Sequence, residues 1–386
     1  FRVALMNWFL ARKTFPKLNI KRVIQISLVH DLCEVYAGDI TPYWGLLPED
    51  KKKRREVLKR WIRLPQKIKL KRDRQKFLKE KKSLEKLIKL LPVSVGREIM
   101  NVWLSYERMG NLEGKFVKQG DKIETLLQAL EYWGTKPNSP VIGWWEEVYE
   151  LVDHPLLLDF LSKIEKKFYQ NKKINGEINF FLEMSKIKKM PRRGWVLRKV
   201  KNPETIAEHA FLLTLAVWVL GKMKNINLDK ALKMSLIYEI AEVYAGDRTP
   251  YDGIINSKNK KEILKRWPRL SKKEKEKQFI IDCKEEKKAL KKVIASLPKD
   301  LQGEIFFLWE ECKESLTPEA KFVNQVYWIT TYLQALQYFQ EDKNFPILAW
   351  YEQMRVYIDN PFLLELLEEM EDKFLAGQKL NFCSFN

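Results

Sequence analysis

The stretch HDLCEVYAGDITPY at residues 30–43 returns, slightly changed, as YEIAEVYAGDRTPY at residues 238–251. Nine of the fourteen positions are identical. The chemistry changes at the first two positions, where His30 and the aspartate after it become Tyr238 and a glutamate. A histidine beside an aspartate can hold a metal through an imidazole nitrogen and a carboxylate oxygen, and a tyrosine in its place removes the better ligand. The first stretch therefore predicts a chemical site and the second a structural one.

The similarity between the two halves of the chain continues downstream in the same order. Residues 51–64 match 259–270, 83–92 match 289–298, 115–133 match 321–339, and 149–161 match 356–367. This order indicates a tandem duplication of one domain. We expect copy one at residues 1–169, a polar linker at 170–179 and copy two at 180–386. Copy one is expected to be incomplete at its start, because copy two has a lead up to His209 that copy one does not show.

The pattern of apolar residues predicts the fold class. Apolar side chains recur at spacings of three and four in segments of ten to twenty residues, which is typical of helices, and no alternating strand pattern of useful length appears. Prolines and Gly-Asp pairs mark the ends of these segments. We predict an all-α fold made of two helical bundles in series.

Composition limits the kind of protein and its partners. The chain has 386 residues with 45% hydrophobic content, enough for two packed cores, and its longest apolar run, residues 210–220, is too short to span a membrane. Lys and Arg exceed Asp and Glu by 20, which favours anionic partners such as nucleotides or RNA, although solvated faces of Lys-rich helices explain the charge equally well. Four widely spaced cysteines fit an intracellular, reducing compartment.

Three side chains of the first stretch are candidates for a shared site. If residues 23–35 form one helix, Glu34 lies four residues after His30 and three after Asp31, so the three share a face. This arrangement suits two metal ligands and a neighbouring base.

Asp121 is a fourth candidate from a distant part of the chain. It lies on a mostly apolar helical stripe, where a carboxylate needs a partner. The matching residue of copy two is Tyr327, so the copy that lacks the His-Asp pair lacks this carboxylate as well. Joint loss at separated positions is the pattern that a shared site would produce.

These residues lie in motifs that resemble a known family. Copy two contains RRGW at 192–195 and NPETIAEH at 202–209, and copy one contains HDLCEVYAGDITP followed by FVKQGDKIETLLQALEYW. Together they resemble the HD-domain metal-dependent phosphohydrolases, within them the all-helical branch similar to bacterial 5′-deoxynucleotidases. The resemblance implies one divalent transition metal, such as Co, Mn, Fe or Zn, held by a histidine of an EH pair, the His-Asp pair and a late aspartate. It also implies an internal pseudo-dimer, because relatives of this branch pair as homodimers.

Carried over to this chain, the resemblance assigns a role to each candidate. The expected metal ligands are His30, Asp31 and Asp121, with a fourth expected just ahead of Phe1. Glu34 would be the general acid or base, and Asp39 would position the substrate and the attacking water. In copy two the vestigial counterparts are His209, Glu242 and Asp247, and a single histidine cannot hold a catalytic metal.

Two functions follow from these observations. The first is a nucleotide phosphohydrolase, of the 5′-deoxynucleotidase type, with its site in copy one. The alternative is a catalytically inactive basic adaptor that binds RNA or a ribonucleoprotein assembly. Glu34 and Asp39 do not decide between them, since both persist in copy two, where helix capping or pairing with lysine would explain them. Trp61 and Trp267, in a repeated KRW motif, are predicted to be packing anchors.

Overall fold

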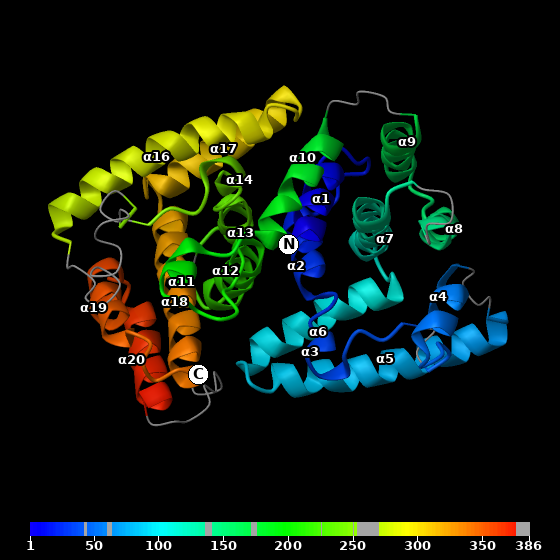
Figure 1. The fold of residues 1–386 in the computed structure, drawn as a ribbon, viewed down its shortest axis with the longest axis horizontal. Helices are drawn as coiled ribbons and strands as arrows, with labels where there is room; N and C mark the ends of the chain where they lie inside the picture. Colours follow the sequence, from blue (N-terminus) through cyan, green and yellow to red (C-terminus); the bar gives the residue numbers. More distant parts are fainter. Residues whose placement is uncertain are drawn as a thin grey trace. The chain divides into compact units, whose positions relative to one another are not determined.

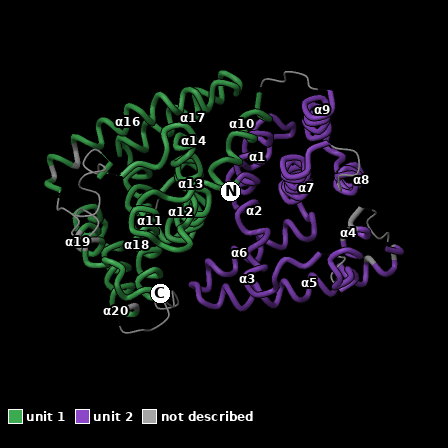
Figure 2. Tube along the Cα trace, in the orientation of Figure 1, with its two compact units in different colours: residues 1, 175–380 green, residues 2–174, 381–386 purple. Residues whose placement is uncertain are grey.

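The computed structural model (Figure 1) describes residues 1–41, 45–59, 64–135, 141–170, 176–224, 226–249, 251–252 and 270–375. The chain divides into two compact units (Figure 2): an N-terminal unit of residues 2–174 and a C-terminal unit of residues 175–380 together with Phe1. The predicted anchors Trp61 and Trp267 and residues 171–175 of the predicted linker lie outside the described residues.

The N-terminal unit is built from helices. They are α1 (Arg2–Ala11), α2 (Ile20–Val29), α3 (Glu34–Ala37), α4 (Lys51–Lys59), α5 (Gln66–Ile88), α6 (Val93–Arg108), α7 (Leu112–Trp133), α8 (Val141–Leu151) and α9 (Pro155–Tyr169).

The described part of the C-terminal unit is also helical. Its elements are α10 (Glu177–Met184), the 3₁₀ turn η1 (Lys186–Lys189), α11 (Arg193–Leu197), α12 (Ile206–Gly221), α13 (Leu228–Ile237), α14 (Glu242–Ala245), α16 (Lys272–Ile294), α17 (Lys299–Lys313), α18 (Pro318–Glu341), α19 (Ile347–Tyr357) and α20 (Pro361–Leu375). Because α10 begins at Glu177, the last three residues of the predicted linker are helical. Extended pairing in the described residues is limited to one isolated bridge between Pro191 and Thr205, so the prediction of an all-α fold is confirmed.

The same packing recurs in the two units. In the N-terminal unit α1 packs on α2 and α7, α6 packs on both of the latter, and α3 packs on α5. In the C-terminal unit α12 packs on α13 and α18, α17 packs on both of the latter, and α14 packs on α16. Each unit therefore has a central helix, α7 or α18, on which both preceding and following helices pack.

The central helix α7 is fixed by its cap and by a close contact with α1. Asn111 caps its start by accepting a hydrogen bond from the Gly114 amide at 2.7 Å. Further along, a Cβ atom on Gly120 would fall 1.8 Å from the Asn7 Oδ1 atom of α1. Only a glycine allows α1 to approach this closely, and the residue after it is the site candidate Asp121.

The prediction of one helix over residues 23–35 is wrong. Helix α2 ends at Val29, and α3 begins only at Glu34. Between them the backbone forms tightened turns, in which the Leu32 amide bonds the Val29 carbonyl at 3.1 Å and the Glu34 amide bonds the Asp31 carbonyl at 3.0 Å.

At this break the His30 side chain occupies a helical acceptor, but it does not cause the break, because α13 and α14 are interrupted in the same way between Ile237 and Glu242, where a tyrosine replaces the histidine. The His30 Nδ1 atom lies 2.9 Å from the Ser27 carbonyl, which in a continuous helix would accept the amide of residue 31. After α3 the chain turns at Gly38, whose φ of +73° suits glycine. His30 and Asp31 are thus presented at the end of a helix.

Within the described residues, no helix is long and apolar enough to cross a membrane. The three cysteines described, Cys33, Cys283 and Cys312, are free thiols.

Candidate active site

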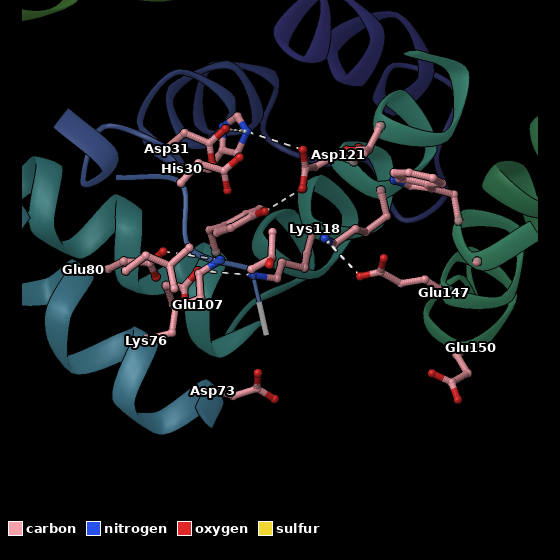
Figure 3. A pocket seen from close by; sticks show the side chains of 18 of the residues that line it. His30, Asp31, Asp73, Lys76, Glu80, Glu107, Lys118, Asp121, Glu147 and Glu150 are labelled. Atoms are coloured by element: carbon pink, nitrogen blue, oxygen red, sulfur yellow. Dashed lines mark hydrogen bonds and ion pairs between the residues drawn. The ribbon is translucent and has the colours of Figure 1, made fainter. Parts of the chain in front are cut away.

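The end of α2 and the middle of α7 bring three of the predicted site residues together (Figure 3). His30 Nε2 lies 3.0 Å from an Asp31 carboxylate oxygen and 3.5 Å from an Asp121 carboxylate oxygen. The His30 and Asp121 side chains are mostly buried, whereas that of Asp31 is 61% exposed. The distant partner expected for Asp121 is therefore the His-Asp pair.

Hydrogen bonds to residues outside the cluster orient the His30 and Asp121 side chains. The Ser27 carbonyl can only accept, so His30 Nδ1 donates to it and Nε2 is directed at the carboxylates. The second oxygen of Asp121 accepts a hydrogen bond of 2.7 Å from the Tyr106 hydroxyl on α6. Such outer contacts fix the orientation of metal-binding side chains.

The charges in the cluster favour a cation between the carboxylates. Burial lowers the pKa of His30, but the Asp31 charge and the hydrogen bonds to Asp121 and Asp31 outweigh it and raise that pKa to about 10. Burial raises the pKa of Asp121, yet the hydrogen bond and charge of His30 bring it below the usual range. The two carboxylates therefore hold a positive charge strongly, and a proton on His30 supplies it when no metal does.

The donor atoms suit a divalent transition metal. Imidazole nitrogen and carboxylate oxygen bind such ions at about 2.0–2.2 Å, so neighbouring donors on one ion lie roughly 3.0–3.5 Å apart. The separations from His30 Nε2, 3.0 and 3.5 Å, fall in this range. In the described part of the chain, no three His, Cys, Asp or Glu side chains are already arranged to hold a metal ion. Enclosing one would thus require movement, for which the exposed Asp31 side chain has freedom.

The cluster lies in a cavity of about 1350 Å³ within the N-terminal unit. Among the described residues, ten carboxylates and three lysines line it, so this part of its wall is strongly acidic. The carboxylates are Asp31, Glu34, Asp39, Asp73, Glu80, Glu107, Asp121, Glu146, Glu147 and Glu150. A cavity of this charge repels an anion unless cations are bound in it.

The two predicted catalytic residues both line this cavity. Asp39 is exposed, and Glu34 is half-buried at the start of α3. Burial, followed by the charges of Asp31 and Asp39, raises the pKa of Glu34 to about 7. A carboxyl group with this pKa can both donate and accept a proton near neutral pH.

Three lysines bring positive charge to the cavity, each in an ion pair. Lys118 lies 3.2 Å from Glu107 and Lys122 lies 3.1 Å from Glu147, while Lys76 pairs with the nearby Glu80. Lys118 and Lys122 lie on either side of Asp121 in the sequence of α7, and both line the same cavity as the candidate metal site.

Sequence reasoning missed Tyr106 and the flanking lysines. A usable signal for Tyr106 was its match with Cys312, since copy two lost the tyrosine together with the counterpart of Asp121. Lys118 and Lys122 are likewise replaced in copy two, by Asn324 and Trp328. The sequence does not single out these two lysines, because lysines are common on helices.

The corresponding place in the C-terminal unit contains a closed hydrogen-bonded core. His209 is fully buried, with Nδ1 2.8 Å from Glu239 Oε1 and Nε2 3.1 Å from the Thr330 hydroxyl. Tyr238 and Tyr327, at the positions of His30 and Asp121, stack with ring centroids 4.8 Å apart. Both nitrogens of His209 are thus engaged with protein groups.

A buried arginine reaches both counterparts of the carboxylate ligands. Arg192, only 6% exposed, donates from Nη2 to the Tyr327 hydroxyl at 2.6 Å, and its Nε lies 4.0 Å from Glu239. Its Nη1 also contacts the Thr331 hydroxyl at 3.3 Å and Glu204 at 3.6 Å. A guanidinium therefore brings the positive charge into this core.

The retained carboxylates of copy two are also located in this region. Burial and the charges of Asp247 and Glu239 raise the pKa of Glu242 well above its usual range. Asp247 accepts a hydrogen bond from the Arg193 amide at 2.6 Å. The carboxylate thus accepts a hydrogen bond from the first amide of α11, which has no partner within the helix.

Comparison with known proteins places these sites in context. A family model described as HD domain matches residues 1–151 and 184–360. The 5′-deoxynucleotidase HDDC2 of Bos taurus is 29% identical over 211 residues, 54% of this chain and 91% of the relative. That of Homo sapiens is 29% identical over 195 residues, 50% of this chain and 84% of the relative. The crystal structure of the PH0347 protein from Pyrococcus horikoshii OT3 matches with a TM-score of 0.38 and 25% identity, covering 51% of this chain and 98% of that one.

Proposed function

The chain belongs to the HD-domain family, and from this premise we propose that it is a metal-dependent phosphohydrolase that removes phosphate from nucleotides. The active site is the cavity of the N-terminal unit. The proposal rests chiefly on one observation: His30 Nε2 faces Asp31 and Asp121 at 3.0 and 3.5 Å inside an acidic cavity. The names of the relatives, 5′-deoxynucleotidases, support nucleoside monophosphates as the substrate class.

The residues of the site would have separate roles in metal binding, proton transfer and orientation of the attacking water. His30, Asp31 and Asp121 would hold one divalent ion. Such an ion, when bound, polarises phosphoryl oxygens and lowers the pKa of a bound water. Glu34, with its pKa near 7, lies in the same cavity and is suited to take a proton from the attacking water or give one to the leaving oxygen. Asp39 is exposed beside it and can orient that water.

Lys118 and Lys122 are suited to bind the phosphate. Each already pairs with a glutamate, and each lies within one helical turn of Asp121. A phosphate dianion can exchange with the glutamate for the ammonium group, because its charge and acceptor oxygens are stronger. The acidic walls disfavour the extra charge of a triphosphate, which favours monophosphates.

We further propose that the C-terminal unit is a metal-free scaffold. Its counterparts of the ligands bind Arg192, and both nitrogens of its single retained histidine are engaged. A guanidinium cannot activate water, so this core would stabilise its unit without turnover. The internal pseudo-dimer and the preferred metal ion stay predictions.

Phosphate release provides the test. The full chain with Mn²⁺ or Co²⁺ should release inorganic phosphate from dAMP, and EDTA should stop it. Asp121→Asn should lower the rate by at least about a hundredfold, since it removes a ligand and its charge. Tyr238→Phe, at the position of His30 in the C-terminal unit, is the control and should keep the activity.

The adaptor hypothesis predicts a different set of results. No nucleotide would release phosphate in any divalent ion, while RNA would bind with an affinity that falls steeply with salt and is the same in Asp121→Asn. That combination would refute the hydrolase proposal.

A further inference from the structure

An aromatic side chain lines the cavity on the wall formed by α8. Trp144 is half-buried there, together with Glu146, Glu147 and Glu150 of the same helix. Its indole stacks on Trp133 at the end of α7, with ring centroids 5.1 Å apart and an interplanar angle of 30°. This contact holds the indole in a defined orientation.

An ion pair connects the helix that carries Trp144 to the helix that carries Asp121. Lys122 follows Asp121 on α7 and pairs with Glu147 of α8 at 3.1 Å. Trp144 precedes Glu147 by three residues, so it lies on the same face of α8 about one turn, or roughly 5 Å, away. A phosphate between the two carboxylates and Lys122 would thus leave its sugar and base directed toward α8.

The charge of the α8 wall selects what part of a ligand can lie against it. Three carboxylates line this wall, and Figure 3 shows Glu147 and Glu150 along it. An anionic group is repelled there, whereas an uncharged heterocycle with amino or imino donors is accepted. The phosphate of a bound nucleotide would therefore lie beside His30, and its uncharged base would lie against α8.

The C-terminal unit offers a precedent for a ring on this tryptophan. The residue that matches Trp144 is Trp350, and Trp195 of the same chain packs on it with ring centroids 5.0 Å apart. In the C-terminal unit, the tryptophan at this position thus packs against a second aromatic ring.

We propose that Trp144 is the platform on which the nucleobase of the substrate stacks, and so sets the requirement for a nucleotide over a simple sugar phosphate. The inference rests on the proposed hydrolase function for its substrate, but not for the binding of the base. Stacking of a base on an aromatic side chain is worth about 1–3 kcal/mol, which corresponds to about a five- to hundredfold change in binding.

Two substrates and two variants test this role. Trp144→Leu should raise the KM for dAMP by about five- to a hundredfold and leave hydrolysis of deoxyribose 5-phosphate within about twofold. Trp144→Phe should restore most of the loss. The control is Trp145→Phe: Trp145 does not line the cavity, but it stacks on Tyr149, which does, and a phenylalanine keeps that contact.

Binding of deoxyadenosine, measured by calorimetry, separates this inference from the hydrolase proposal. It needs no metal and no turnover, and Trp144→Leu should weaken it while Trp145→Phe should not. If no phosphate is released from any compound yet this difference persists, the hydrolase proposal fails and the platform stands. If Trp144→Leu changes dAMP and deoxyribose 5-phosphate alike, or neither nucleoside binding nor KM changes, the platform is overturned.

Discussion

The proposal that Arg192 takes the place of a metal in the C-terminal unit can be tested through stability. Arg192→Met keeps the buried stem but removes the charge and both side-chain hydrogen bonds, to Tyr327 at 2.6 Å and Thr331 at 3.3 Å. Hydrogen bonds to a charged group contribute about 1.5–3 kcal/mol each, and loss of one partner from a buried charge network costs about 3–5 kcal/mol. We expect the free energy of unfolding of this unit to fall by about 3–5 kcal/mol.

Amide hydrogen exchange measures this loss in the right unit. Amides of α12 and α18 that exchange through opening of the C-terminal unit should exchange between about a hundredfold and a few thousandfold faster in the variant. Amides of α2 and α7 in the N-terminal unit serve as the internal reference. The measurement uses the full chain, so each unit keeps its normal surroundings.

The neighbouring arginine is a matched control. Arg193 has a 48% exposed side chain that pairs with Asp252, and exposed ion pairs contribute about 0–1 kcal/mol. Arg193→Met should therefore change exchange of α12 and α18 by less than about fivefold. If Arg192→Met behaves like Arg193→Met, the guanidinium does not hold the core and the reasoning is refuted.

Three further changes give separate predictions. Tyr106→Phe removes the hydrogen bond to Asp121, so the metal affinity should fall about ten- to a hundredfold in calorimetry. An unchanged affinity would show that the Tyr106 hydroxyl does not support the site. Burial chiefly raises the pKa of Asp247 from 3.8 to about 6, so the stability that this carboxyl group contributes is present below about pH 3.8 and is lost as the pH rises through 6. In denaturant titrations, the stability of Asp247→Asn relative to the unchanged chain should therefore increase from pH 4 to pH 7. A difference that does not change with pH would contradict this. Gly120→Val introduces the residue of copy two and should destabilise the N-terminal unit by about 1–3 kcal/mol, because the new side chain collides with Asn7. The measurement is amide hydrogen exchange, which should be faster in α7. A neutral effect would mean that α1 moves freely.

The sequence predicts the fold well because the signals are local and repeated. Helical spacing, caps and stops appear in both copies, so each copy checks the other. The long-range meeting of His30 with Asp121 could also be anticipated, since copy two changes both positions. A duplicated chain thus carries information about contacts that a single copy would not.

Other features depend on contacts that spacing does not specify. The break after Val29 consists of tightened turns that recur after Ile237, and a helical pattern continues through it unchanged. The wall of α8 also meets the site only through tertiary packing of α8 on α7. The partners of Arg192 come from α18 and from the turn after α13, which sequence periodicity cannot bring together.

The central claim is that one metal ion is bound in the N-terminal unit and none in the C-terminal unit. Titration of the metal-stripped full chain with Mn²⁺, followed by calorimetry, tests it most directly. We predict one ion per chain, lost in Asp121→Asn and kept in Tyr238→Phe. Two ions per chain, or one ion that persists in Asp121→Asn, would contradict the account.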